Sequence, residues 1–162
     1  MAVLETHIFK AHNNIYIEQP EENYRTREIR TEMVFPDCVN ENTGMLVLIP
    51  GYGGNIDSHV FRKMREVFAE QYNLITVQCD YFGNKFMDVK QPEEMKLIAT
   101  MENIVNAEIY YKVEDFETVE EFNDMGIIQA IDIVSSTICA IYEIIRKGYV
   151  FNTNKIILFG TS

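Results

Sequence analysis

Two short stretches of the sequence carry residue types that could do chemistry. One is Gly51-Tyr52-Gly53-Gly54, and the other is Gly160-Thr161-Ser162, with which the sequence closes. Each follows an unbroken apolar run, Met45 to Ile49 and Ile156 to Phe159, and such runs are typical of strands buried on both faces. A serine lifted on a tight turn can attack a carbonyl carbon, and glycines after a strand let backbone N–H groups turn toward an oxyanion. The two stretches together indicate acyl-transfer chemistry.

Ser162 is the candidate nucleophile. The full pattern G-x-S-x-G places the serine on a strained turn between a strand and a helix, and its two glycines let the neighbouring backbone crowd close. Only G-x-S is present here. Because G-x-S occurs often by chance, its weight depends on the upstream sequence.

The glycine loop is compatible with three kinds of site, which differ in spacing. A dinucleotide-binding loop needs a sixth-position glycine, and Ile56 stands there. A phosphate-binding loop needs Gly-Lys-Ser or Gly-Lys-Thr at its end, which is absent. An oxyanion loop fits best, with the N–H of Tyr52 as the expected donor and that of Gly53 as the runner-up. A glycine turn without any ligand stays open as the structural alternative.

The elements around these stretches predict an α/β fold. Residues 1–35 alternate between apolar and polar positions, which indicates half-exposed antiparallel strands at the sheet edge. Leu74 to Val77 predicts a second buried strand, and an amphipathic helix capped by Asp57 or Ser58 precedes it. A further helix, Ile127 to Lys147, carries one narrow polar stripe and is expected to be buried on most of its circumference. Strand, helix and strand in this order predict right-handed parallel crossovers.

Composition narrows the class of protein. The net charge of -11 disfavours binding to nucleic acids and to anionic membranes. No secretory signal is visible at the start, and two acids interrupt the longest apolar segment, so a cytoplasmic protein without a membrane span is expected. Cys38, Cys79 and Cys139 have neither zinc-site spacing nor an even count, and we interpret them as small buried residues. No metal and no cofactor is expected.

An acidic segment separates the two halves of the predicted fold. Residues 91–124 hold ten acids against two lysines, and such a run is usually a solvated face. Short helices are expected around residues 93–101 and 119–122. The functional alternative for this insertion is a lid or a substrate-entry segment.

The order of these features resembles the α/β-hydrolase superfamily. The resemblance rests on Pro50-Gly51-Tyr52-Gly53-Gly54 after a buried strand, on the run Asp124-Met125-Gly126-Ile127-Ile128-Gln129-Ala130-Ile131-Asp132 that opens a long helix, and on Phe159-Gly160-Thr161-Ser162. More narrowly, the chain resembles a bacterial hydrolase-like family described only as a domain of unknown function. The resemblance covers essentially all of residues 1–162. It implies the N-terminal portion of a single domain, with a mostly parallel sheet, antiparallel N-terminal strands and an end at the nucleophile elbow.

The same resemblance implies an ester or acyl hydrolase with Ser162 as nucleophile and the Tyr52 region as oxyanion loop. In that fold an acid and then a histidine follow the serine, whereas His7, His12 and His59 all precede it. The chain alone is therefore expected to be inactive. The alternatives are a non-catalytic remnant or the binding half of a split protein and, more weakly, a nucleotide-binding domain with Asp80 on the ribose. We expect the chain to need a complementing C-terminal fragment or to self-associate.

Overall fold

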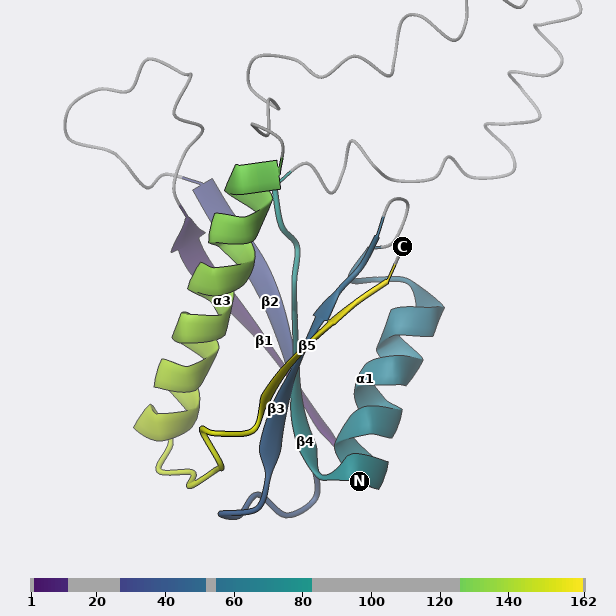
Figure 1. Cartoon of the computed structure of the whole chain (residues 1–162), viewed down its shortest axis with the longest axis vertical. Coiled ribbons are helices and arrows are strands. Elements are labelled where there is room, and N and C mark those ends of the chain that lie inside the picture. The colour runs from purple at the N-terminus through teal and green to yellow at the C-terminus, as the bar shows by residue number, and fades with distance from the viewer. Residues whose placement is uncertain (1, 12–26, 52–54, 83–125, 162) are drawn as a thin grey trace, which may run out of the picture.

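The computed structural model describes residues 2–11, 27–51, 55–82 and 126–161. In this part of the chain one five-stranded sheet lies between two helices, so the α/β class is confirmed (Figure 1). The elements are β1 (Val3–Ala11), β2 (Arg27–Phe35), β3 (Gly44–Ile49), α1 (His59–Tyr72), β4 (Leu74–Cys79), α3 (Ile127–Arg146) and β5 (Ile156–Gly160).

The strands follow the order β1-β2-β4-β3-β5 across the sheet. β2 runs antiparallel to both of its neighbours, β1 and β4, whereas β3 pairs in parallel with both β4 and β5. The antiparallel pairing of the N-terminal strands is therefore confirmed. The half-exposed edge position holds for β1 only, because β2 lies inside the sheet and is buried from Thr31 to Phe35. The expectation of a mostly parallel sheet is wrong, because β2 is inserted between two strands of the opposite direction and makes the sheet mixed.

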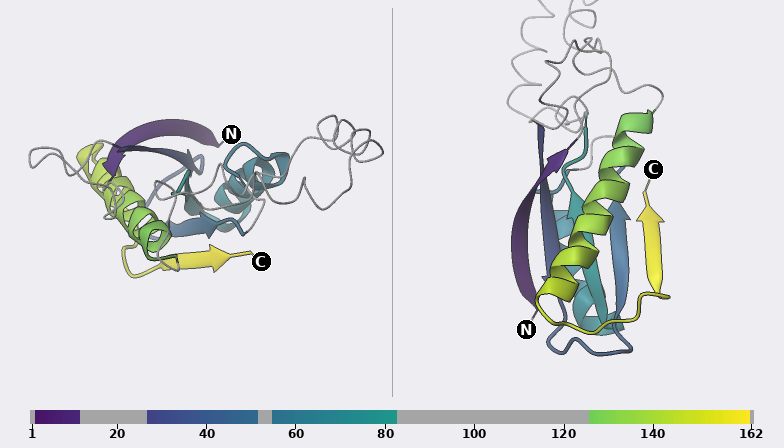
Figure 2. Two further views of the ribbon diagram at one scale, coloured as in Figure 1. Left: turned by 90° about the horizontal axis from the view of Figure 1, so that it is seen from above. Right: turned by 90° about the vertical axis from the view of Figure 1, so that its left-hand side faces the viewer.

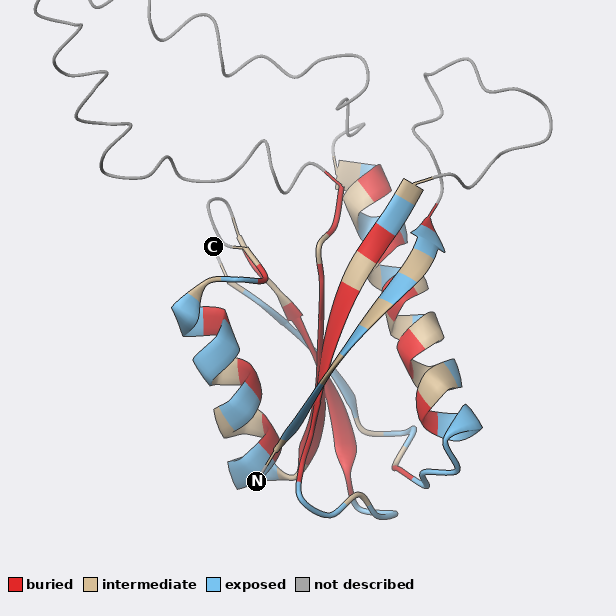
Figure 3. Cartoon of the chain, turned by 180° about the vertical axis from the view of Figure 1, so that it is seen from behind, coloured by how far each residue is buried: buried red, intermediate tan, exposed pale blue. Residues whose placement is uncertain are grey.

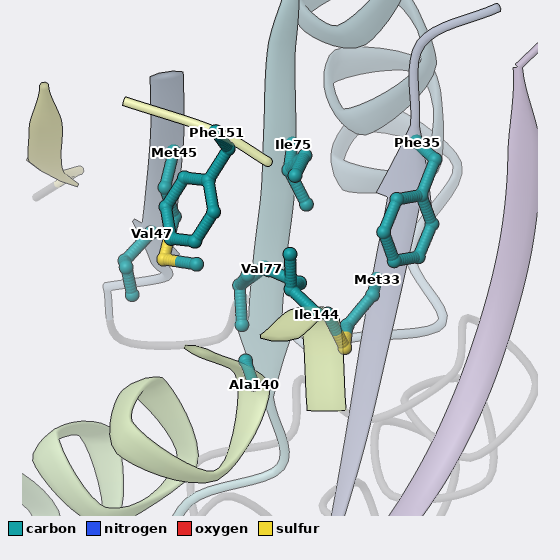
Figure 4. Packing of buried hydrophobic residues seen from close by; sticks show 9 residues of the cluster. All are labelled: Met33, Phe35, Met45, Val47, Ile75, Val77, Ala140, Ile144 and Phe151. Carbon is teal, nitrogen blue, oxygen red and sulfur yellow. The ribbon is translucent and has the colours of Figure 1, made fainter. Parts of the chain in front are cut away.

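The two helices cover opposite faces of the sheet, as both views in Figure 2 show. Successive side chains of β3 point to opposite faces of the sheet and so contribute to two apolar clusters. On one face Leu46 and Leu48 pack with Phe61 of α1. On the other face Met45 and Val47 pack with Ala140 and Ile144 of α3. Figure 4 shows the larger cluster, formed by Met33, Phe35, Met45, Val47, Ile75, Val77, Ala140, Ile144 and Phe151. β3 and β4 are covered on both faces and almost wholly buried, so the prediction of buried strands there is confirmed.

Helix α1 begins where the sequence predicts, and its apolar side packs on the sheet through Phe61, with Met64 and Phe68 partly buried beside it. Ser58 caps it, since its Oγ accepts a hydrogen bond from the N–H of Phe61 at 3.3 Å. Arg65 is 1% exposed and binds Glu32 and Gln78 of the sheet, while Val60 remains 67% exposed. A buried ion pair that the apolar pattern could not reveal therefore sets the rotation of this helix.

The expectation that α3 is buried on most of its circumference is wrong, because its polar stripe faces the sheet and its apolar side is exposed. Asp132 and Ser136 face the sheet and are 1% exposed, because Arg27 binds Asp132 and Thr31 donates to Ser136. The opposite side of the helix is apolar and exposed (Figure 3); it comprises Ile127, Ile131, Val134, Ile138, Tyr142 and Ile145. By length and composition α3 could also cross a membrane, with a mean hydropathy of 1.5, and core helices often share that property.

Strand β5 is parallel as predicted, but it is not buried. Each of its five residues is exposed, and within the described part of the chain only β3 lies beside it. Phe159 touches Phe68 of α1, with ring centroids 6.1 Å apart, so both faces of this edge strand are apolar and only lightly covered.

Some predictions fall outside the described residues. These are the acidic segment 91–124 with its two short helices, and the residues of the glycine loop at positions 52–54. Ser162 also lies outside them.

Close packing at the start of β3 yields a stability prediction. A Cβ on Gly44 would lie 2.8 Å from the backbone oxygen of Lys155, whereas a Cβ on Gly160 would meet nothing within 4 Å. We expect Gly44→Ala to lower the free energy of unfolding by about 1–3 kcal/mol through overpacking. The matched variant Gly160→Ala should change it by less than about 0.5 kcal/mol. Urea denaturation monitored by circular dichroism measures both, and equal effects would contradict the close approach of Gly44 to Lys155.

Candidate site at the ends of strands β3 and β5

The carboxyl ends of β3 and β5 are joined by two hydrogen bonds. The N–H of Thr161 donates to the carbonyl oxygen of Ile49 at 3.1 Å, and the N–H of Gly51 donates to the hydroxyl oxygen of Thr161 at 3.2 Å. The two contacts continue the parallel ladder that ends with Ile49 opposite Gly160. Gly51, at the beginning of the glycine loop, and Thr161, at the end of the described chain, therefore lie side by side.

The three predicted site residues are each next to this junction in sequence but outside the described residues. Tyr52 and Gly53 follow Gly51 directly, and Ser162 follows Thr161. Their roles as oxyanion donors and nucleophile stay predictions. What the structure brings together is the strand end that leads to each of them.

Tyr81 holds the start of the glycine loop from the neighbouring strand. Its phenol donates a hydrogen bond to the carbonyl oxygen of Pro50 at 2.7 Å, and the residue is 5% exposed. Burial raises the pKa of this phenol above its ordinary value, with further contributions from the Cys79 and Asp80 side chains. The Tyr81 hydroxyl therefore stays protonated and remains a donor at neutral pH.

The residue after Tyr81 is clamped by α3. The carboxylate of Asp132 accepts from the N–H of Phe82 at 2.8 Å, and the side-chain amide of Gln129 donates to the carbonyl oxygen of Phe82 at 3.2 Å. Arg27 binds the same carboxylate at 2.5 Å and lies 5.2 Å from the centre of the Phe82 ring. Both backbone polar groups of Phe82 are thus satisfied by side chains one helical turn apart.

His7 lies too far from this junction to act as a base there. His7 lies on β1, four strands from β5 and thus about 19 Å away at the usual strand spacing, and it pairs with Glu5. His59 is the first, exposed residue of α1. His12 lies outside the described residues.

The weaker nucleotide-binding alternative depends on Asp80, which directly follows the carboxyl end of β4. Its N–H donates to the carbonyl oxygen of Arg30 at 2.8 Å. Ile56, at the position where a dinucleotide loop needs glycine, is 1% exposed and is packed into the protein. In a dinucleotide-binding domain, glycine at this position lets the helix pack closely on the strand. The buried side chain of Ile56 counts against that arrangement and therefore against nucleotide binding.

The three cysteines differ in exposure, so the interpretation of all three as buried residues is wrong. Cys38 is exposed, Cys139 is half-buried and Cys79 is buried. Burial raises the pKa of the Cys79 thiol to about 12, so Cys79 is a poor nucleophile. No cluster of three or more metal-binding side chains occurs among the described residues.

An apolar depression on α1 is separate from this junction. It is shallow and open, and it is lined by one helix, at His59, Val60, Lys63, Met64, Val67 and Phe68. Binding sites combine apolar walls with a few convergent polar groups, and this surface lacks such convergence. It therefore does not compete with the strand ends as the candidate site.

Sequence reasoning missed the contacts that organise the junction. Tyr81 looks like one more apolar residue after a strand, and Thr161 is only the variable position of G-x-S. Gln129 and Asp132 belong to the run that opens a long helix, and the run alone assigns them no role. A tyrosine at the end of a buried strand was the one available signal, because a buried phenol requires a partner.

No protein-family model matches this sequence, and no curated protein matches it either.

Proposed function

We propose that this chain builds the nucleophile and oxyanion part of a serine hydrolase site of the α/β-hydrolase type, acting on a small ester or acyl substrate. The observation that carries the proposal is the junction of Ile49, Gly51 and Thr161. Gly51 and Thr161, which are 110 residues apart in sequence, are in direct contact there. Parallel neighbouring strands bring their carboxyl ends together, and here the residues beyond both ends are of the types that acyl transfer requires.

The position of the junction in the sheet supports the same proposal. Ligands of open α/β sheets bind beyond the carboxyl ends of parallel strands, at the point where connections leave in opposite directions. Here the connection after β3 leads through α1 to β4, whereas β5 lies on the other side of β3. The crevice expected from this topology opens between the ends of β3 and β5.

The proposed chemistry divides the work between the two strand ends. The Ser162 hydroxyl attacks the acyl carbon, and the N–H of Tyr52, with that of Gly53 second, stabilises the oxygen that becomes negative. The serine needs a base to take its proton. His7 lies on the opposite edge strand, and His7, His12 and His59 all precede the serine, whereas in the α/β-hydrolase order the base follows it. The proposal therefore assigns the base and its orienting acid to polypeptide beyond Ser162.

There are two alternatives to this function. The first is a non-catalytic binding role, and the second and weaker one is nucleotide binding at Asp80. The proposal includes a cytoplasmic location and no binding to nucleic acid or membrane, in keeping with the net charge of -11.

The proposal predicts a difference between two polypeptides. Residues 1–162 should hydrolyse p-nitrophenyl acetate no faster than their Ser162→Ala variant, because the base is missing. A polypeptide that continues past Ser162 with an acid and a histidine should react at Ser162 with a fluorophosphonate, as peptide mapping by mass spectrometry shows. Labelling at another serine, or none, would contradict the proposed function. Saturable binding of ATP or NAD, weakened by Asp80→Asn, would favour the nucleotide alternative instead.

The apolar edge predicts association of residues 1–162. Among the described strands only β3 pairs with the Ile156 to Phe159 strand, which leaves its other edge open, and the outer side of α3 is apolar. Exposed edges of this kind pair with other chains. We therefore expect dimers or larger species in sedimentation velocity, and fewer of them in Leu158→Lys, which puts a charge on a side chain that is 63% exposed. The matched change Ile8→Lys on β1, 57% exposed, should act less because Lys10 shares its side of the strand and Arg30 lies opposite it on β2. A monodisperse monomer in dilute solution would contradict this prediction.

A further inference from the structure

The peptide unit between Pro50 and Gly51 is held on both sides. Its carbonyl oxygen accepts from the Tyr81 phenol at 2.7 Å, and its N–H donates to the Thr161 hydroxyl oxygen at 3.2 Å. One planar group is thereby fixed by two side chains from two different strand ends, those of β4 and β5. A peptide plane cannot rotate without breaking both contacts, since its carbonyl and N–H point in opposite directions.

Tyr81 is itself held in place, so its hydrogen bond can restrict the orientation of the Pro50–Gly51 peptide. Its ring is buried, and the next residue is held at both backbone groups by Asp132 and Gln129 of α3. Arg27 from β2 binds the far side of the Asp132 carboxylate. The side chain that reaches Pro50 therefore stands on a backbone that two other elements hold in place.

We propose that Tyr81 and Thr161 are positioning residues that orient the Pro50–Gly51 peptide and so set the direction in which the glycine loop leaves β3. The proposal deepens the proposed function, on which it rests for its catalytic consequence. An oxyanion donor must point at the place where charge develops, and its direction follows from the dihedral angles just before it. Tyr81 would act through the loop without touching the substrate.

The competing explanation is that Tyr81 only satisfies a buried carbonyl group and stabilises the fold as a whole. The two explanations predict that removal of the Tyr81 hydroxyl changes the exchange rates of different amides. A general loss of stability accelerates exchange of all core amides by the same factor, whereas loss of local order accelerates only those near the peptide.

Hydrogen exchange in the chain of residues 1–162 separates the two. Tyr81→Phe keeps the ring and removes the hydroxyl, and Tyr149→Phe makes the same change on an exposed residue away from the junction. We expect the Gly51 amide to exchange about tenfold faster in Tyr81→Phe, as loss of one hydrogen bond implies. The amides of Met33 and Val34 should keep their rates, and Tyr149→Phe should change neither. Unchanged exchange at Gly51, or equal acceleration at Met33, would overturn the proposal.

Changes at Thr161 test whether both residues act on one peptide. Thr161→Val removes the acceptor of the Gly51 N–H and should accelerate its exchange, whereas Thr161→Ser keeps a hydroxyl and should restore slow exchange. If one plane is held at both ends, adding Tyr81→Phe to Thr161→Val should change the Gly51 rate by less than about twofold, since coupled contacts are not additive. Two independent effects would multiply, and that result would contradict the shared role.

Turnover gives a second readout in the polypeptide that continues past Ser162. There Tyr81→Phe should lower kcat with little change in KM, because the loop is misdirected while substrate binding is kept. A change in KM alone would count against a role in orienting the loop. Failure of Ser162 to react in the unaltered polypeptide would contradict the proposed function, while the exchange rates at Gly51 would still decide whether Tyr81 and Thr161 position the peptide.

Discussion

The backbone of β3 is the constraint on which the other elements depend. It is the one described strand that is paired in parallel on both edges, with β4 and with β5. Each of its N–H and C=O groups needs a partner once it leaves water, so the position of β3 dictates the register of both neighbours. Its side chains then alternate between the layers under α1 and under α3. The residues that follow β3 start from the best-anchored point of the sheet.

Polar contacts across the sheet faces decide how the helices rest on that strand. Arg65 of α1 reaches Glu32, and Asp132 of α3 is reached by Arg27, so both helices direct a charged group inward. Such pairs gain little net free energy over apolar packing, but leaving one partner alone is costly. They favour one rotation of each helix over the others. In α3 the same contact also fixes the backbone after β4, which links helix orientation to the candidate site.

The regular elements of the fold were predictable because their signals are local. The apolar runs of β3 and β4, the Ser58 cap and the period of α1 each lie within a few residues of sequence. The inward face of α3 was not predictable, since a helix with one polar stripe is expected to turn it toward water. Asp132 turns inward because it binds Arg27 on the sheet. The two residues are 105 positions apart in sequence, so no local pattern indicates this contact. The two halves of the candidate site were identified from residue types, whereas Tyr81 required knowledge of which carbonyl lies within its reach.

The order of strands also bears on how the chain folds. Thr43 and Asn73, which bracket the crossover through α1, are 30 positions apart, and their side chains bond at 2.9 Å. Gly51 and Thr161 are separated by 110 positions. Closing a loop of that length costs roughly 4 kcal/mol of chain entropy before any contact compensates it. The unit of β3, α1 and β4 can therefore form early, as a template onto which β5 docks late, and the candidate site is assembled only in that last step.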